Sequence, residues 1–133
     1  SQLVIDEVIN SPYVNGAKEF LEKYHCVIDL YVASGTPEGE LRKIVRCREM
    51  DVYFKDVYGS PRKKGEIVKS ILQENGYDPR DVIFVGDSIT DLKGAQYSGT
   101  RFIGRVTDSV GNPFAGMGVK AIKDLNALEE IIQ

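Results

Sequence analysis

The feature that most constrains the fold of this 133-residue chain is a regular alternation of helical and strand-like patterns from Gly16 onward. Apolar residues recur at helical spacing over residues 17–24 and 64–75, whereas residues 82–86, VIFVG, are continuously apolar. A strand that is apolar throughout is expected where helices cover both faces of a sheet. The alternation therefore predicts an α/β domain, a three-layer Rossmann-like fold in which a parallel sheet has helices on both faces.

Composition and charge exclude several classes of protein. Hydrophobic residues make up 42% of the chain and charged residues 28%, which is typical of one globular domain, and the net charge of −3 offers no basic excess for nucleic acid. No apolar run approaches the roughly twenty residues that cross a bilayer. The first ten residues, SQLVIDEVIN, lack the basic start of a secretory signal. We therefore expect no nucleic-acid or membrane partner, a cytoplasmic location, and ordinary thiols at Cys26 and Cys47.

Polar residues stand at three points that would share one edge of the predicted sheet. Because the carboxyl ends of parallel strands meet at the same edge, that edge is where a ligand is expected. A hydroxyl, an ammonium and two carboxylates are the groups that can hold a phosphate and a hard cation. The residues are Ser34 with Gly35 and Thr36 after one strand, Lys64 with Arg62 and Lys63 at a helix start, and Asp87 with Asp91 after VIFVG.

Each of these residues also has a simpler structural interpretation. Ser34 could cap the helix that begins near Pro37, and Lys64 could be a solvated surface lysine. Asp87 could be a turn residue, and Asp91 could stabilise the N-terminus of its helix through the helix dipole. Their joint placement favours a site, because several polar residues on one edge are less readily explained as independent caps.

The same residues resemble motifs two, three and four of the haloacid dehalogenase superfamily, whose members are mostly magnesium-dependent phosphatases. The segments that carry the resemblance are ASGT, GSPRKKGEIV and VIFVGDSITD, in that order, and the similarity extends over residues 10–106 and is greatest to phosphoglycolate-phosphatase-like members. The resemblance implies the following roles: phosphate binding by Ser34, Gly35, Thr36 and Lys64 (or Lys63), Mg²⁺ binding by Asp87 and Asp91, and catalytic function for Ser34, Lys64 and Asp91, with Asp91 supporting the metal or orienting the lysine.

The superfamily's first motif, Asp-x-Asp at the end of the first strand, is absent from the chain. In the superfamily the first of these aspartates attacks phosphorus and the second acts as general acid and base. The nearest candidate for the first is Asp6 in LVIDEV, but Val8 stands where the second carboxylate belongs.

Two interpretations of residues 1–10 follow from this absence. They are the end of a helical cap, or they contain a degenerate first strand over residues 3–6. The context NSPYVNGAKEFL favours the cap, so we expect a core over residues 11–133 that lacks the usual first strand and cap, and an upstream segment that supplies the nucleophile. The difficulty is that two neighbouring strands would then have unpaired edges.

The expected function is that of a magnesium-dependent phosphomonoesterase core acting on a small phosphorylated metabolite, with the chain alone inactive. The alternative is a non-catalytic module of the same fold that binds phosphate or a protein. A response-regulator receiver is excluded by the order of Ser34, Lys64 and Asp87, because acidic residues come first in a receiver. A dinucleotide-binding loop and a phosphate-binding P-loop are excluded because neither glycine pattern occurs.

Overall fold

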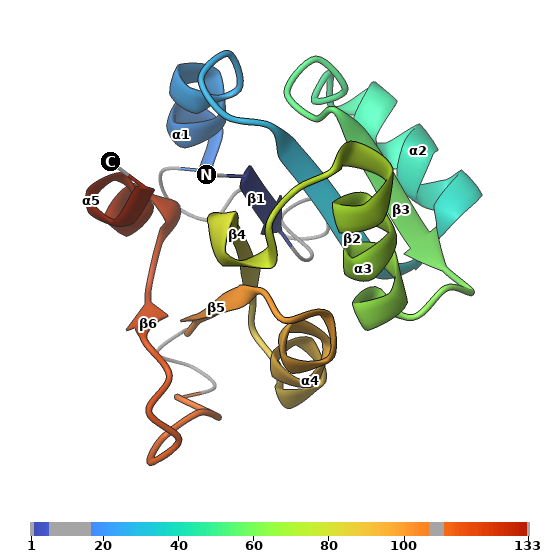
Figure 1. Ribbon diagram of the computed structural model, residues 1–133. Coiled ribbons are helices and arrows are strands. Elements are labelled where there is room, and N and C mark those ends of the chain that lie inside the picture. The colour runs from blue at the N-terminus through green and yellow to red at the C-terminus, as the bar shows by residue number, and fades with distance from the viewer. Residues whose placement is uncertain (1, 6–16, 107–110, 133) are drawn as a thin grey trace.

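The computed structural model describes residues 2–5, 17–106 and 111–132. Within these ranges a parallel sheet has the strand order β3-β2-β1-β4-β5-β6 (Figure 1). The strands are β1 (Gln2–Ile5), β2 (Leu30–Pro37), β3 (Asp56–Ser60), β4 (Val82–Gly86), β5 (Arg101–Arg105) and β6 (Ala121–Ile122). The helices are α1 (Ala17–Tyr24), α2 (Glu38–Cys47), α3 (Lys64–Asn75), α4 (Ile89–Ser98) and α5 (Glu129–Ile132), with 3₁₀ turns η1 (Pro79–Asp81) and η2 (Leu125–Leu128).

Two hydrophobic clusters, one on each face of the sheet, confirm the predicted three-layer α/β architecture. On one face, buried residues of α1, α2 and η2 pack against Leu3 and Ile5 of β1. On the other face, residues of α3 and α4 pack against Val4. The alternation of Leu3, Val4 and Ile5 between the two clusters is the period of two that a strand imposes. All five residues of β4 are buried, as the continuous apolar run predicted.

The expectation that the core lacks its first strand is wrong, because Gln2–Ile5 form β1 in the middle of the sheet. β1 pairs in parallel with β2 on one side and with β4 on the other. The helical-cap interpretation therefore does not hold for Gln2–Ile5, which form a strand. The alternative placed a strand over residues 3–6, and the last of these, Asp6, lies outside the described residues. The physical reason is the unpaired-edge problem: a strand in this slot completes the ladders of two neighbours and buries three apolar side chains. The proposed boundary at residue 10 lies outside the described residues.

The carboxyl end of β2 departs from regular pairing at the site of interest. The register between β2 and β3 shifts between Ala33 and Pro37, so the intervening residues leave the regular ladder. Gly59 of β3 lies against this irregular stretch: a Cβ atom at position 59 would stand 2.2 Å from the Thr36 carbonyl oxygen. A glycine is therefore required where the two strands approach most closely.

Helices α3 and α4 stand side by side on one face of the sheet, and their first turns lie at its carboxyl edge (Figure 1). The predicted helix over residues 64–75 is confirmed, including its end at Gly76, which has a left-handed φ of +68°. Helix α4 begins at Ile89, directly after its N-cap residue Ser88. Among the described residues, no helix is long and apolar enough to cross a membrane.

Candidate active site

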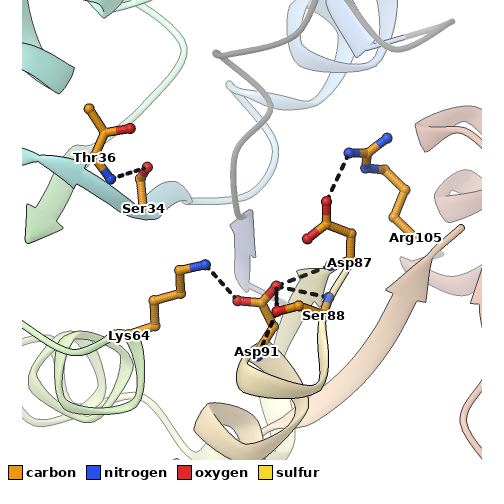
Figure 2. A network of polar contacts seen from close by, with 7 residues as sticks. All are labelled: Ser34, Thr36, Lys64, Asp87, Ser88, Asp91 and Arg105. Carbon is orange, nitrogen blue, oxygen red and sulfur yellow. Dashed lines mark hydrogen bonds and ion pairs between the residues drawn. The ribbon is translucent and has the colours of Figure 1, made fainter. Parts of the chain in front are cut away.

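Polar side chains from β2, β5, α3, α4 and the turn between β4 and α4 converge at the carboxyl edge of the sheet (Figure 2). The predicted residues Ser34, Lys64, Asp87 and Asp91 all lie there, and a residue that the sequence analysis did not include, Arg105, lies with them. The central strand β1 ends at the same edge, between β2 and β4. This edge is where ligands bind in open parallel sheets.

Ser34 is a fully buried hydroxyl at the end of β2. Its exposed fraction is 0%, and its Oγ accepts a hydrogen bond from the Thr36 N–H at 3.1 Å. The Thr36 N–H, which was predicted to bind phosphate, is thus directed at Ser34 instead. The capping interpretation of Ser34 is wrong, because α2 has Pro37 at its N-cap and no side-chain cap. In the ranges that the structure describes, the Ser34 hydroxyl has no recorded acceptor for its own proton, although buried hydroxyls normally have one.

Lys64 forms an ion pair with Asp91, with 2.9 Å between the lysine Nζ and the carboxylate Oδ1. The side chains are 14% and 0% exposed, so the interpretation of Lys64 as a solvated surface lysine is wrong. Lys63, the other candidate for the motif lysine, is exposed and stands at the N-cap of α3. The structure therefore favours Lys64 over Lys63.

The second oxygen of Asp91 closes the first turn of α4. Oδ2 accepts hydrogen bonds from the backbone N–H groups of Asp87 (3.1 Å) and Ser88 (3.2 Å) and from the Ser88 hydroxyl (3.0 Å). Ser88 in return accepts the Asp91 N–H at 3.2 Å, which completes a capping box. Asp91 therefore stabilises its helix as well as orienting Lys64. With both oxygens engaged, it fits a positioning role better than that of a direct metal ligand.

Gly86 is required by this arrangement. A Cβ atom at position 86 would lie 2.4 Å from the Asp91 Cβ and 2.6 Å from its Oδ2, closer than real Cβ contacts. The glycine between the buried strand and Asp87 therefore allows the Asp91 carboxylate to fold back under the strand end. The sequence GDSITD combines this glycine, the cap and both carboxylates in six consecutive residues.

Asp87 faces Arg105, which ends β5. The Arg105 Nη2 lies 3.5 Å from the Asp87 Oδ2, and the two side chains are 10% and 37% exposed. Arg105 lies at the end of the strand-like run RFIGRV, residues 101–106, just as Ser34 and Asp87 lie at the ends of their strands. Its position in the sequence therefore also indicates the carboxyl edge. A buried arginine places a second cation at the edge, next to the carboxylate that the resemblance assigns to a metal.

The donor set at this edge agrees in part with Mg²⁺. Asp87 is a partly exposed carboxylate, and Mg²⁺ takes one or two carboxylates while keeping water and phosphate oxygens as its other ligands. No cluster of three acidic, histidine or cysteine side chains able to hold a metal occurs within residues 2–5, 17–106 and 111–132. Asp6, the remaining candidate, lies outside the described residues. Asp87 is thus the one described residue that suits direct ligation of Mg²⁺.

The chain belongs to the haloacid dehalogenase-like hydrolases, because the model of that family matches residues 5–105. This match confirms the resemblance inferred from the three motifs. It spans Asp6, Ser34, Lys64 and both carboxylates of GDSITD.

Three proteins that are similar to this chain are described below. A 5'-nucleotidase from Pseudomonas aeruginosa is 34% identical over an alignment of 80 residues, and the alignment covers 56% of this chain and 36% of that protein. The core domain of a protein assigned as a phosphoglycolate phosphatase from Streptococcus pneumoniae has a TM-score of 0.75 at 20% identity, covering 98% of this chain and 93% of that domain. A haloacid dehalogenase-type hydrolase from Bacillus subtilis, bound to magnesium, has a TM-score of 0.72 at 20% identity, covering 90% of this chain and 56% of that protein. The chain thus spans about a third of the matched nucleotidase and about half of the hydrolase.

Proposed function

We propose that the chain is the catalytic core of a Mg²⁺-dependent phosphomonoesterase that acts on a small phosphorylated metabolite. The observation that carries this proposal is the buried ion pair of Lys64 and Asp91, held beside the Ser34 hydroxyl at the edge where the central strand ends. Family membership adds support, since the matched family consists of hydrolases. In this proposal five side chains take part in phosphate binding and catalysis: Asp6, Ser34, Lys64, Asp87 and Asp91.

Phosphate binding falls to Ser34 and Lys64. The buried Ser34 hydroxyl accepts from Thr36, so its proton is available to a phosphate oxygen. An ammonium group has three N–H donors, so Lys64 can hold Asp91 and a phosphate oxygen together. The backbone N–H of Gly35 remains the predicted third donor. Asp91 fixes the direction of the ammonium, which matters because phosphoryl transfer is accelerated chiefly by positioning and charge neutralisation.

Asp6 is the proposed nucleophile, because it follows Ile5, the last residue of the central strand, directly in the sequence. Residues 2–5 fill the slot between β2 and β4, so we propose Asp6 in preference to a residue of an upstream segment. One carboxylate oxygen would form a bond to phosphorus while the bond from phosphorus to the alcohol oxygen breaks. Mg²⁺, held by Asp87, would neutralise charge on the phosphate oxygens when bound.

The absence of a second carboxylate at Val8 predicts slow turnover. The departing alkoxide has to take its proton from water, and water has no base for the hydrolysis of the aspartyl phosphate. General acid and base catalysis is typically worth about a hundredfold to ten-thousandfold in rate. Val8 and the Asp87–Arg105 ion pair together favour a second candidate function, a module that binds phosphate without turning it over.

Hydrolysis of p-nitrophenyl phosphate by the 133-residue chain, with Mg²⁺ or with EDTA, tests the proposal. We expect slow, Mg²⁺-dependent turnover that is lost in Asp6→Asn and Asp87→Asn and raised at least about a hundredfold in Val8→Asp. Asp51→Asn, an exposed carboxylate remote from the edge, is the matched control and should leave the rate unchanged. Turnover that survives Asp6→Asn would rule out Asp6 as the nucleophile. Phosphate binding with no turnover in the chain or in Val8→Asp would establish the second candidate.

A further inference from the structure

A basic hollow adjoins the phosphate site on the side of α3 and α4. It is a cavity of about 690 Å³, and Lys64 and Gly35 of the phosphate site are part of its lining. Its other cationic side chains are Arg62, Lys63 and Lys93, against a single carboxylate, Glu66. This concentration of positive charge stands out in a chain whose net charge is −3. Of the three consecutive basic residues Arg62, Lys63 and Lys64, only Lys64 has a role in the phosphate site, through its ion pair with Asp91.

Two glycines, Gly65 and Gly94, line the hollow where α3 and α4 meet. Helices α3 and α4 touch through their backbones, since a Cβ atom at Gly65 would lie 3.2 Å from the Gly94 Cα and 3.1 Å from the Tyr97 ring. Tyr97, which is 60% exposed, forms a wall of the cavity next to this close contact. Lys69 stands over the Tyr97 ring, with its Nζ 5.0 Å from the ring centroid. The hollow therefore combines an aromatic wall with a basic rim, which suits an organic group that carries negative charge.

Three of the cations, Arg62, Lys63 and Lys93, have no charge partner in the described parts of the chain. Arg62 donates to the Ser70 hydroxyl at 2.8 Å and lies over the Tyr58 ring, and Lys64 pairs with Asp91. No ion pair or hydrogen bond is recorded for the side chain of Lys63 or of Lys93 among the described residues. Like charges gathered on one concave surface repel each other and raise the local concentration of anions. Charge complementarity therefore points to an anionic occupant.

We propose that this hollow is the subsite for the leaving group of the substrate, and that the leaving group carries a second acidic function, a carboxylate or a phosphate, which Lys63 and Lys93 bind. The inference rests on the proposed function for the position of the transferred phosphate, between Ser34 and Lys64. Lys64 and Gly35 line both sites, so one ligand can reach from the first to the second. The substrate class is thus narrowed to phosphate monoesters with two anionic ends.

Binding of phosphonates, which cannot be hydrolysed, tests the subsite separately from catalysis. ω-Phosphonoalkanoates and alkane bisphosphonates of increasing chain length are titrated into the 133-residue chain by calorimetry, each against the alkylphosphonate of equal length. We expect the best dianionic-ended ligand to bind about fivefold tighter than its alkylphosphonate, as two exposed ion pairs allow. The phosphonoalkanoates carry a carboxylate as their second anion, and the bisphosphonates carry a phosphonate in place of a phosphate. Comparing the affinities of the two series shows which kind of anion the hollow prefers.

Three lysine variants make the assignment specific. Lys63→Gln and Lys93→Gln should each reduce the advantage of the two-ended ligand, and the double variant should abolish it while alkylphosphonate affinity stays the same. Lys43→Gln, an exposed lysine on α2, is the matched control and should change nothing. Equal affinities throughout the series, no binding of either ligand, or an advantage that survives the double variant would each overturn the subsite. If the chain hydrolyses phosphate esters but does not bind two-ended ligands more tightly than alkylphosphonates, only the subsite is overturned. If the chain is inactive but does bind two-ended ligands more tightly, the subsite is supported and the phosphatase proposal is weakened.

Discussion

Strand β2 has a polar network at each of its ends, and the two networks differ in what they leave unsatisfied. At the amino end, Tyr77 donates to the Asp29 Oδ2 at 2.5 Å and shares a hydrogen bond of 2.7 Å with the Tyr31 hydroxyl. Lys55 adds an ion pair to the same carboxylate at 3.7 Å. At the carboxyl end stand a buried hydroxyl with a proton to donate, two cations and two carboxylates, beside a basic hollow.

The difference between the two networks shows that a cluster of polar residues by itself does not define a binding site. In the amino-end network each hydroxyl is paired and the carboxylate faces a lysine, so the hydroxyl donors are used within the network itself. It serves stability by satisfying buried polar groups. The carboxyl-end network is held in place just as firmly by the capping box of α4, yet it presents a donor and positive charge toward the end of the central strand. Polar groups that are held rigidly but lack a hydrogen-bond or charge partner indicate a binding site.

The largest expected effect comes from removing the cation of the carboxyl-end pair. Lys64→Met leaves the buried Asp91 carboxylate without its counter-charge, and breaking a buried pair in this way destabilises a protein by about 3 kcal/mol. Lys55→Met at the amino end removes a lysine that is 51% exposed and should cost less than about 1 kcal/mol. Urea unfolding of both variants measures the difference. Equal losses would mean that Lys64 is effectively solvated and that the two ends of β2 are alike.

The amino-end network should respond next, through one hydroxyl. Tyr77→Phe removes the hydrogen bond to Asp29 and the partner of Tyr31, and should lower the free energy of unfolding by about 1 to 3 kcal/mol. It should leave phosphonate affinity unchanged, because the network lies at the opposite edge. Tyr97→Phe, whose hydroxyl has no recorded partner among the described residues, is the control for stability. A change in phosphonate affinity in Tyr77→Phe would contradict the separation of the two networks.

The arginine at the carboxyl end is expected to compete with a metal for Asp87. Arg105→Leu removes the cation 3.5 Å from Asp87, so Mg²⁺ should bind about fivefold tighter. Calorimetric titration with Mg²⁺ reports this without any need for activity. Arg101→Leu, at the exposed start of the same strand, is the control. Weaker Mg²⁺ binding in Arg105→Leu would show instead that the arginine helps to hold Asp87 in position.

The smallest expected effect is a difference in alkaline stability. Burial, followed by hydrogen bonds with Asp29 and Tyr31, raises the pKa of Tyr77 above the ordinary tyrosine value of 10.0, and burial raises the pKa of Tyr58 to about 12. The unfolded chain therefore loses these protons at lower pH than the folded chain, so the stabilisation is complete below about pH 10 and declines above it. Unfolding free energies between about pH 9 and pH 11 should fall less steeply in Tyr77→Phe than in the parent chain. Parallel slopes would show that the pKa of Tyr77 is not raised in the folded chain.

Sequence patterns predicted the bounds of some elements well and of others poorly. The helices over residues 17–24 and 64–75 and the strand over 82–86 have the predicted bounds, because each contains enough apolar residues to show its period. Gln2–Ile5 contains three apolar residues, too few to distinguish a helix from a strand, and the cap interpretation was wrong for that reason. Strand β2 runs to Pro37 rather than ending at Ser34, because its last residues follow an irregular pairing with β3 that no local pattern reveals.

The residues that reach the carboxyl edge can be identified from the sequence alone. Strand ends, the glycine of GDSITD and the helix start at Lys64 are all local features. The tertiary structure alone decided their roles. It separated Lys64 from Lys63 by a buried contact with Asp91, turned the Thr36 N–H toward Ser34, and brought Arg105 to Asp87. It also placed Gln2–Ile5 between β2 and β4. The reason is that pairing, burial and charge neutralisation depend on neighbours distant in the sequence, and these exist only once the chain has folded.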